Sequence, residues 1–575
     1  MKKSNQYNLP RKKTDNGALP FNWNIYKYGF IIFTLLFFYL LFFRIEAPLI
    51  WNDESETIMT GKTILTYGYP KVHDGKNIIF LPEQKEWIGY DKALDANFTI
   101  PWGSYYFASI AAYISQNIDD LYLKTFWSRL PFGIIGSLGI FFFGLTLNSI
   151  SSTKKYFGWS VYLFFICFSV SLFLHLKQLR YYSLVIFDIS LITYIINLYF
   201  VNKKLTYNKY LIVFSLALFF TYQTNLLVYA AATLSCFLFT FYYHLAETNH
   251  LTTAEKSKAI LKDCVPYIIS GVLVLPFLIF YKTFEIAALA TEFYKATNEA
   301  YVNNLIRIWE YLNNLEFIFV FIAIKLCAVF VWIRSSKCGN HPNILQINKL
   351  RLLSILLSFI FIIFVLLISK MPFLFVRHFI VLTPILAIMA GTDIILFHTF
   401  NEKNNILIVV FYGIIFSILF ITSPKKIKYF KEYLYEVSHQ RKGPLDFIIP
   451  YLKERYQHPD QLTIATNYEE LSYVYYLNCK TVLGYNYKNL AEDTTTTPDI
   501  LVYRKKWGHD PMPFNHFMSK AKYEKVTFPV FDSPTNDITE IEWFFTQHLF
   551  KTKMATKPED QVEIYILSNT NTSKI

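Results

Sequence analysis

The stretch that decides the fold is residues 25–70, which read IYKYGFIIFTLLFFYLLFFRIEAPLIWNDESETIMTGKTILTYGYP. Its first part, Ile25–Phe43, is an apolar run long enough to cross a bilayer core of about 30 Å as a helix. Basic residues precede this run and no small-residue cleavage site follows it, so we expect a retained anchor with a cytoplasmic start. Three carboxylates, Asp53, Glu54 and Glu56, come directly after the anchor. The sequence therefore predicts an acidic segment just outside the membrane.

The composition of the whole chain agrees with a membrane protein. Of 575 residues, 53% are hydrophobic and only 17% are charged, and the mean hydropathy is +0.28. Soluble proteins carry about 25% charged residues. The net charge of +13 comes from short Lys and Arg clusters between apolar runs, without the basic, aromatic-rich face that nucleic-acid binding needs. The six cysteines show no CxxC spacing, so we expect neither a disulfide framework nor a structural zinc site.

Hydrophobicity predicts about eleven membrane-spanning helices. The predicted spans are Ile25–Phe43, Leu130–Leu147, Phe157–Leu174, Tyr182–Phe200, Tyr210–Tyr222, Leu226–Tyr243, Val265–Tyr281, Leu315–Ile333, Leu352–Ile368, Phe379–Phe397 and Ile406–Ile421.

The segment Pro101–Gln116 decides the topology. If it does not cross the membrane, the basic loops between later spans all lie in the cytoplasm with the N-terminus, as the positive-inside rule requires. If it does cross, four of these loops violate the rule. We therefore expect an amphipathic helix on the outer surface, because the segment is short and rich in Ser, Gln and Tyr.

The fold class that follows is an all-α polytopic membrane protein with a small C-terminal α/β domain. We expect a basic cytoplasmic N-terminus (1–24), a transmembrane domain (25–422) with an outer catalytic loop (44–129), and an extracytoplasmic α/β domain (423–575). The last region holds four strand-like segments and one helical segment, namely LTIAT from Leu462, TVLGY from Thr481, DILVY from Asp499, EIYIL from Glu563 and EELSYVYYL between the first two.

The carboxylates after the first span allow two interpretations. In the first, Asp53 is a helix N-cap and Glu56 its capping-box partner. In the second, Asp53 is a general base that deprotonates a hydroxyl acceptor near a lipid-borne phosphate. The residues alone do not decide between the two, and the first leaves Glu54 without a role.

Cations on the outer surface favour the second interpretation. The segment HLKQLRYYSL brings Lys177 and Arg180 to the outer end of the third span, and KMPFLFVRHF brings Lys370, Arg377 and His378 to the outer end of the ninth. Lysines at such places also snorkel to headgroups. Arginine is the better phosphate ligand, because its planar guanidinium matches phosphate oxygens at two points. A base with two arginines is what displacement of a phosphate-linked sugar requires.

Other polar residues are weaker candidates for a functional site. We give His73, Asp74 and His244 no metal role, and we predict no metal site and no cofactor, although the sequence does not exclude a divalent metal. Lys325 and Asp393 lie within predicted spans, where structural pairing is the simpler interpretation. Motifs of soluble enzymes such as the P-loop, GxGxxG, HExxH and GxSxG are absent from the sequence.

Several segments together resemble a known family. They are WNDESETIMTGKTILTYGYP, TIPWGSYYFASIAAYI, WSRLPFGIIGSLGIFFFGL, LRYYSL, LFFTYQTNLLVYAA and VRHFIVLTPILAIMAG. In them the chain resembles the GT-C glycosyltransferases that use polyprenyl-phosphate sugars, the family 39-like group with the protein O-mannosyltransferases and the lipid A aminoarabinose transferases. Two departures stand out: Trp102 follows Pro101 where the family has a second proline, and Tyr181 follows Arg180 where many relatives have Asp.

The resemblance implies a membrane glycosyltransferase of the cell envelope that moves a sugar from a polyprenyl-phosphate carrier to a lipid, glycan or protein acceptor outside the cytoplasm, with inversion. It implies that Asp53 is the catalytic carboxylate and that Glu54 fills the second place of the pair. The residues expected to contact the carrier phosphate or substrate are Arg180, Arg377, Lys177, Tyr181, Tyr182 and His378.

Two other functions are compatible with the sequence. A transporter or flippase of a lipid-linked or anionic substrate is the main alternative, although the inverted repeats and broken midplane helices of such proteins are not apparent. A noncatalytic scaffold that presents the C-terminal domain is the second. We expect the bacterial cytoplasmic membrane, with the endoplasmic reticulum as the other compartment that suits this topology.

Overall fold

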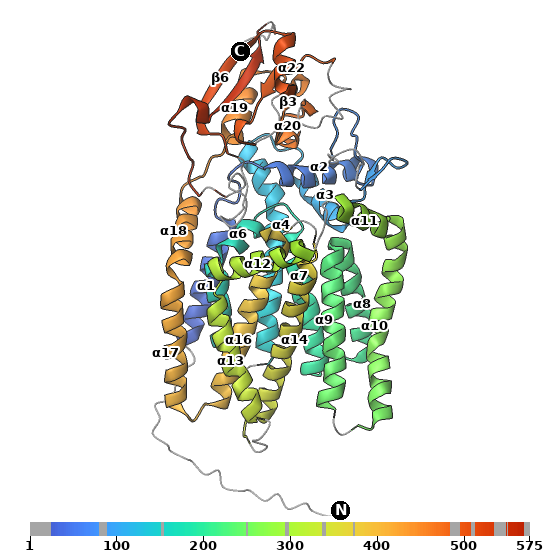
Figure 1. The fold of residues 1–575 in the computed structure, drawn as a ribbon, viewed down its shortest axis with the longest axis vertical. Helices are drawn as coiled ribbons and strands as arrows, with labels where there is room; N and C mark the ends of the chain where they lie inside the picture. Colours follow the sequence, from blue (N-terminus) through green and yellow to red (C-terminus); the bar gives the residue numbers. More distant parts are fainter. Residues whose placement is uncertain are drawn as a thin grey trace, which may run out of the picture.

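Long apolar helices form a bundle that carries a small mixed sheet at one end (Figure 1). The computed structural model describes residues 25–79, 89–150, 154–248, 251–293, 298–335, 341–371, 374–483, 495–507, 512–533, 548 and 550–568. Each of the eleven predicted spans lies mainly in helix. The bundle helices are α1 (Ile25–Phe42), α4 (Leu121–Ile150), α5 (Lys155–Phe168), α6 (Val170–Leu176), α7 (Tyr182–Ile196), α8 (Tyr207–Thr224), α9 (Leu226–Tyr242), α10 (Thr253–Phe280), α13 (Ile318–Ser335), α14 (Ile344–Ile368), α16 (Leu382–Phe400) and α17 (Asn405–Thr422).

Length and composition identify 8 membrane-crossing helices in the described chain, or 9 if α5 and α6 count as one bent span. Helix α1 adds a shorter apolar stretch, Tyr26–Phe42, and α8, which is polar at both ends, stands in the same bundle (Figure 1). Helix α16 lies at the centre, and every residue of its apolar window is buried. The chain is therefore a polytopic, mainly helical membrane protein, as the sequence predicts.

The third predicted span, Phe157–Leu174, is wrong as a single straight helix. The axis bends by 78° between α5 and α6, where Ser169 takes an extended conformation (φ −88°, ψ 91°). The Ser169 hydroxyl donates to the buried Glu316 carboxylate at 2.6 Å. This hydrogen bond gives the buried Glu316 carboxylate a donor at the bend. The turn that follows α6 leads to Arg180.

Two helices lie across the end of the bundle that carries the sheet (Figure 1). They are α2 (Asn52–Tyr67) and α3 (Gly103–Ser115). They touch at Gly61, where an added Cβ would come within 2.7 Å of the Ala108 backbone. Helix α3 falls within Pro101–Gln116 and lies across the end of the bundle, so this segment is not one of the bundle helices. Near the same end lie the short strands β1 (Tyr90–Asp91) and β2 (Ala96–Asn97) and the helices α11 (Thr283–Phe293) and α12 (Asn298–Asn314).

The C-terminal region builds a five-stranded sheet in the order β4-β3-β5-β7-β6. Strand β3 pairs in parallel with β4 and β5, whereas β7 runs antiparallel to β5 and β6. The elements are α18 (Pro424–Ser438), α19 (Leu445–Arg455), β3 (Thr463–Thr466), α20 (Glu470–Leu477), β4 (Lys480–Leu483), β5 (Ile500–Val502), α22 (Met512–Lys520), β6 (Tyr523–Phe531) and β7 (Gln561–Leu567). The four predicted strands and the predicted helix are confirmed. The prediction missed β6, a largely exposed edge strand that contains a proline.

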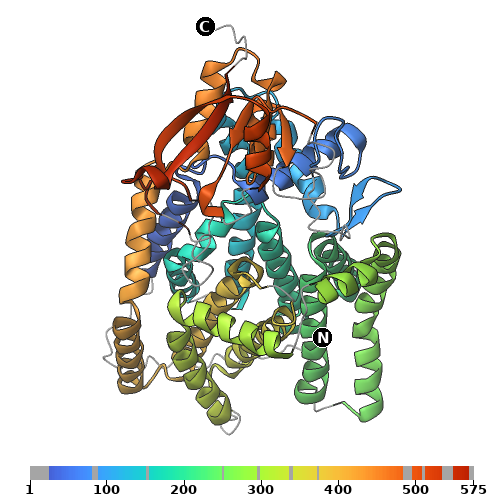
Figure 2. The ribbon, with the colours of Figure 1, turned by 45° about the horizontal axis from the view of Figure 1, so that its top comes forward.

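The sheet region lies at one end of the bundle (Figure 2), where it contacts the segment that precedes α2. The Ser472 hydroxyl donates to the Ile50 carbonyl at 2.9 Å, and the Ile50 N–H donates to the Tyr476 hydroxyl at 2.9 Å. Leu49 N–H donates to the buried Asp446 carboxylate at 3.2 Å. These contacts fix α20 over the start of α2, where the acidic segment lies.

Candidate active site

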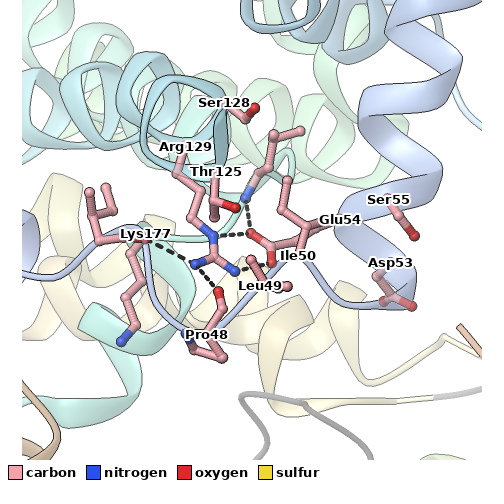
Figure 3. A network of polar contacts seen from close by, with 12 residues as sticks. Pro48, Leu49, Ile50, Asp53, Glu54, Ser55, Thr125, Ser128, Arg129 and Lys177 are labelled. Carbon is pink, nitrogen blue, oxygen red and sulfur yellow. Dashed lines mark hydrogen bonds and ion pairs between the residues drawn. The ribbon is translucent and has the colours of Figure 1, made fainter. Parts of the chain in front are cut away.

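The acidic segment forms the first turn of α2, and its two neighbouring carboxylates point to different sides (Figure 3). Helix α2 begins at Asn52, and the N-cap residue is Trp51, which offers no side-chain cap. The capping interpretation of Asp53 is therefore wrong. Asp53 lies inside the first turn, where a negative charge still gains from the helix dipole.

Asp53 meets the two arginines that the sequence singled out. Arg377 Nη1 lies 2.6 Å from Asp53 Oδ2, and Arg180 Nη2 lies 3.7 Å from the same oxygen. The Asp53, Arg180 and Arg377 side chains each keep 16% of their surface exposed. Residues distant in sequence thus form one partly open cluster of a carboxylate and two guanidinium groups.

Hydrogen bonds to α2 hold Arg180 in this cluster. Its Nη1 donates to the Asp53 carbonyl and to the Thr57 hydroxyl, both at 2.9 Å. Burial by itself lowers the pKa of Arg180, but the negative charges of Asp53 and Glu56 outweigh it and keep this pKa well above its ordinary value. Arg180 is therefore a fixed cation.

Arg377 comes from the opposite wall of the site. It belongs to the short helix α15 (Val376–Phe379), and its guanidinium lies 4.1 Å from the centre of the Phe375 ring. The His378 Nδ1 accepts a hydrogen bond from the Phe375 N–H at 3.2 Å, which closes this turn. A packed and hydrogen-bonded turn thus aims Arg377 at Asp53.

A small cavity of about 30 Å³ adjoins the cluster. Its lining includes Tyr181, Tyr182, Asn225, Arg377 and His378. The two tyrosine rings lie 4.6 Å apart between centroids. The predicted binding residues Tyr181, Tyr182 and His378 are therefore gathered beside Arg377, although a phosphate would enter only after side chains move.

Glu54 lies away from this cluster, in the interior (Figure 3). Its side chain is 0% exposed. Its Oε2 lies 2.5 Å from Arg129 Nη2, and its Oε1 accepts from Arg129 Nε at 2.8 Å and from the Leu179 N–H at 2.9 Å. Both carboxylate oxygens are occupied by protein donors, so the prediction that Glu54 acts in catalysis does not fit its environment. The pair fixes α2 against α4 and the turn that carries Arg180.

Sequence reasoning gave Arg129 no chemical role, although it is the other half of this network. Arg129 Nη1 donates to the carbonyls of Ile45 and Pro48 at 2.9 and 2.8 Å. An arginine at the start of an apolar span was the available signal, because such a charge needs a partner.

Lys177 is also placed away from Asp53. Its Nζ lies 2.9 Å from Glu436 Oε1, and only 7% of its side chain is exposed, so neither phosphate contact nor snorkelling describes it. Burial by itself raises the pKa of Glu436, but His548 and Lys177 outweigh it and hold this pKa at about 2. Lys177 therefore joins α6 to α18 through a buried ion pair. Lys370 is exposed, and its Nζ lies 3.9 Å from the centre of the Tyr301 ring.

The remaining candidates have ordinary partners. His73 pairs with Asp95 at 2.6 Å and His244 with Asp263 at 2.9 Å. The intramembrane pair Lys325–Asp393 is confirmed, with 2.9 Å between Nζ and Oδ2. Within the described residues, no three His, Cys, Asp or Glu side chains are grouped so as to hold a metal ion.

Comparisons with known proteins give fold-level similarity. No family model and no curated protein matches the chain. Among solved structures, ArnT from Cupriavidus metallidurans bound to undecaprenyl phosphate is similar at 11% identity and a TM-score of 0.48, over 95% of this chain and 99% of that one. The Archaeoglobus fulgidus oligosaccharyltransferase complexed with Zn and sulfate is similar at 13% identity and a TM-score of 0.49, over 83% and 67% of the two chains.

The archaeal oligosaccharyltransferase AglB from Archaeoglobus fulgidus, in complex with an inhibitory peptide and a dolichol-phosphate, is similar at 10% identity and a TM-score of 0.46, over 83% of this chain and 69% of that one. Identities this low, with TM-scores below 0.5, decide neither the substrate nor the mechanism of the present chain. Its function has to be argued from its own site.

Proposed function

We propose that this protein is an inverting membrane glycosyltransferase that uses a polyprenyl-phosphate-linked sugar as donor. The observation that carries the proposal is the contact of Asp53 with Arg377, with Arg180 beside them, at the outer end of an apolar bundle. A base next to two fixed cations suits the displacement of a phosphate-linked group. A lipid-borne donor suits the position at the membrane surface.

The reaction forms one bond and breaks one at the anomeric carbon of the donor, and one proton moves. The acceptor hydroxyl oxygen attacks the anomeric carbon of the donor, and the bond between that carbon and the phosphate oxygen breaks. Asp53 takes the hydroxyl proton, while the electron pair leaves with the carrier phosphate. Attack opposite the leaving group inverts the anomeric configuration.

Arg180 and Arg377 stabilise the leaving phosphate, whose negative charge grows in the transition state. The cations are in place before the reaction, because Arg180 is bonded to α2 and Arg377 is packed on Phe375. Removing one such preorganised donor typically raises the barrier by about 3 kcal/mol. Tyr181, Tyr182 and His378 line the adjoining cavity and contact the sugar or phosphate. Glu54 and Arg129 hold α2 against α4 and support the fold.

The topology that suits this reaction puts the N-terminus in the cytoplasm and Asp53 on the far side of the membrane. The basic loops at the opposite end of the bundle support that orientation. Residues 25–422 then form the transmembrane domain, with loop 44–129 as the catalytic loop, and residues 423–575 form an extracytoplasmic domain. The bacterial cytoplasmic membrane is the compartment we propose, and the acceptor is a lipid, glycan or protein outside the cytoplasm.

Donor turnover tests the proposal. Purified protein in lipid nanodiscs is given a panel of polyprenyl-phosphate sugars labelled in the sugar, with and without acceptors from envelope extracts, and release of free polyprenyl phosphate is measured. We expect cleavage of at least one donor. Proteoliposomes that move intact donors between leaflets without cleaving any would overturn the proposal in favour of a flippase.

A further inference from the structure

The turn between β3 and α20 has features of a ligand-binding site in an α/β sheet. Strand β3 is flanked by β4 on one side and β5 on the other, both parallel to it. The chain therefore leaves β3 and β5 at the same edge and in different directions. Ligands of such sheets bind at this edge, outside the carboxyl ends of the strands.

This edge is held rigidly. The Arg504 N–H donates to Asn467 Oδ1 at 2.8 Å, and Asn467 Nδ2 donates to the Arg504 carbonyl at 3.2 Å, so the segments after β3 and β5 are bonded to each other. The buried Arg504 guanidinium also pairs with Glu469 and Asp532. Glu469 has a positive φ of 61°, a conformation that costs a non-glycine residue free energy and persists only where the surroundings impose it.

The edge faces the start of α2. Ser472 and Tyr476 of α20 bond to Ile50, just before α2. Burial, Glu469 and Asp53 together raise the pKa of the Tyr468 phenol. The C-terminal region thus lies next to the proposed catalytic carboxylate, on the side away from the bundle.

One buried carboxyl oxygen at this edge has no hydrogen-bond donor among the described residues. Glu470 is only 2% exposed, and its Oε2 accepts no hydrogen bond from any residue that the structure describes. Burial raises the pKa of this carboxyl to about 7, and Glu56 and Glu469 add to the effect. Glu56 lies one turn after Asp53 on α2. A buried carboxyl oxygen without a donor is costly unless a ligand supplies the donor.

We propose that Glu470 of α20, together with Glu56 of the neighbouring helix α2, forms an acceptor subsite that binds the hydroxyl groups of a carbohydrate acceptor. Carboxylates accept hydrogen bonds from neighbouring sugar hydroxyls, and the spacing of one helical turn between Glu56 and Asp53 leaves the next hydroxyl for the base. Glu470 is then a specificity residue that the C-terminal region contributes to a site on the membrane region. The inference rests on the proposed function and names the class of its acceptor.

Binding experiments on the full chain in nanodiscs test this subsite. The probes are maltotriose, mannotriose and chitotriose, measured by saturation-transfer NMR, and polyprenyl phosphate, measured separately by native mass spectrometry. We expect the parent protein to bind at least one trisaccharide and the Glu470→Gln and Glu56→Gln variants to bind it at least tenfold more weakly. Glu559→Gln, an exposed change in the same region, serves as the matched control and should bind like the parent.

The outcomes separate the subsite from the proposed function. Polyprenyl phosphate binding should be unchanged in the Glu470→Gln variant and weakened by Arg377→Gln. A parent that binds trisaccharides but no polyprenyl phosphate contradicts the proposed donor and leaves the subsite standing. The subsite is overturned if the parent binds none of the trisaccharides. It is also overturned if a well-folded Glu470→Gln variant binds them as well as the parent. A third contrary outcome is that glucosamine oligomers with free amines bind much more tightly than their neutral counterparts.

Discussion

Asp53 and Glu54 are neighbours on one helix and yet belong to two different regions. About 100° separates successive residues around a helix axis, so one carboxylate faces the outer site and the other faces the bundle. Asp53 meets Arg377 and Arg180 in a partly open cluster. Glu54 meets Arg129 in a pair with almost no exposed surface. We propose that the same side-chain chemistry serves the reaction in the Asp53 cluster and folding in the Glu54 pair.

The role of an ion pair depends on how exposed it is and on whether its carboxylate oxygens can still accept hydrogen bonds. The Glu54 oxygens are saturated by Arg129 and the Leu179 N–H, so nothing is left for a substrate. The Asp53 pair lies beside a cavity and below the turn that carries Glu470. If this distinction holds, substitutions in the Glu54–Arg129 pair should affect stability, and substitutions in the Asp53 cluster should affect turnover.

The largest effect is expected from Glu54→Gln. The change leaves the Arg129 guanidinium buried without its carboxylate, which typically costs about 3–5 kcal/mol of folding free energy. Unfolding in detergent, followed by heat or denaturant, measures it. The double variant Glu54→Gln/Arg129→Met should recover much of the loss. A loss below about 1 kcal/mol would contradict the structural role of Glu54.

Arg377→Gln should lower turnover a hundredfold or more, or about 3 kcal/mol of barrier, because it removes a cation from the leaving phosphate. Its melting temperature should stay close to that of the parent. Arg334→Gln is the control, since Arg334 is an exposed arginine in the last turn of α13, away from the Asp53 cluster. Equal losses in the two variants would mean that surface charge in general, rather than the Asp53 cluster, supports turnover.

The free energy of unfolding should depend on pH through the titration of Glu470, which lies in the C-terminal region. The pKa of Glu470 is raised to about 7, mainly by burial. A raised carboxyl pKa stabilises the fold fully below the unfolded pKa, and this stability is lost as pH rises through 7. Between pH 5.5 and 8.5 the parent should lose about 2 kcal/mol that the Glu470→Gln variant keeps. Parallel melting curves of the two proteins across this range would show that Glu470 does not titrate there.

The smallest effect is expected from Thr57→Val. The Thr57 hydroxyl accepts a hydrogen bond from Arg180 at 2.9 Å, and one such bond is worth about 1 kcal/mol. Turnover should fall about fivefold, with little change in stability. Thr66→Val, on the exposed end of α2, is the control. A hundredfold loss would mean that Thr57 contacts the reacting groups directly.

Sequence reasoning predicted the helices, the position of Pro101–Gln116 outside the bundle, four strands and the convergence of Asp53 with Arg180 and Arg377, because these depend on hydrophobicity, charge and topology. It could not assign Glu54 or Lys177, since their partners Arg129 and Glu436 lie far along the chain. The bend at Ser169 escaped for the same reason: a buried carboxylate from a distant helix stabilises it. Whether a charge is paired is decided by tertiary contacts that a local pattern does not contain.

The central claim is that Asp53 performs chemistry while Glu54 supports the fold. The most direct test measures donor turnover and the melting temperature of Asp53→Asn and Glu54→Gln side by side with the parent. We predict that Asp53→Asn melts like the parent and loses turnover a hundredfold or more, whereas Glu54→Gln melts earlier and keeps most of its turnover at temperatures where it is folded. Full turnover by a well-folded Asp53→Asn variant would contradict the account.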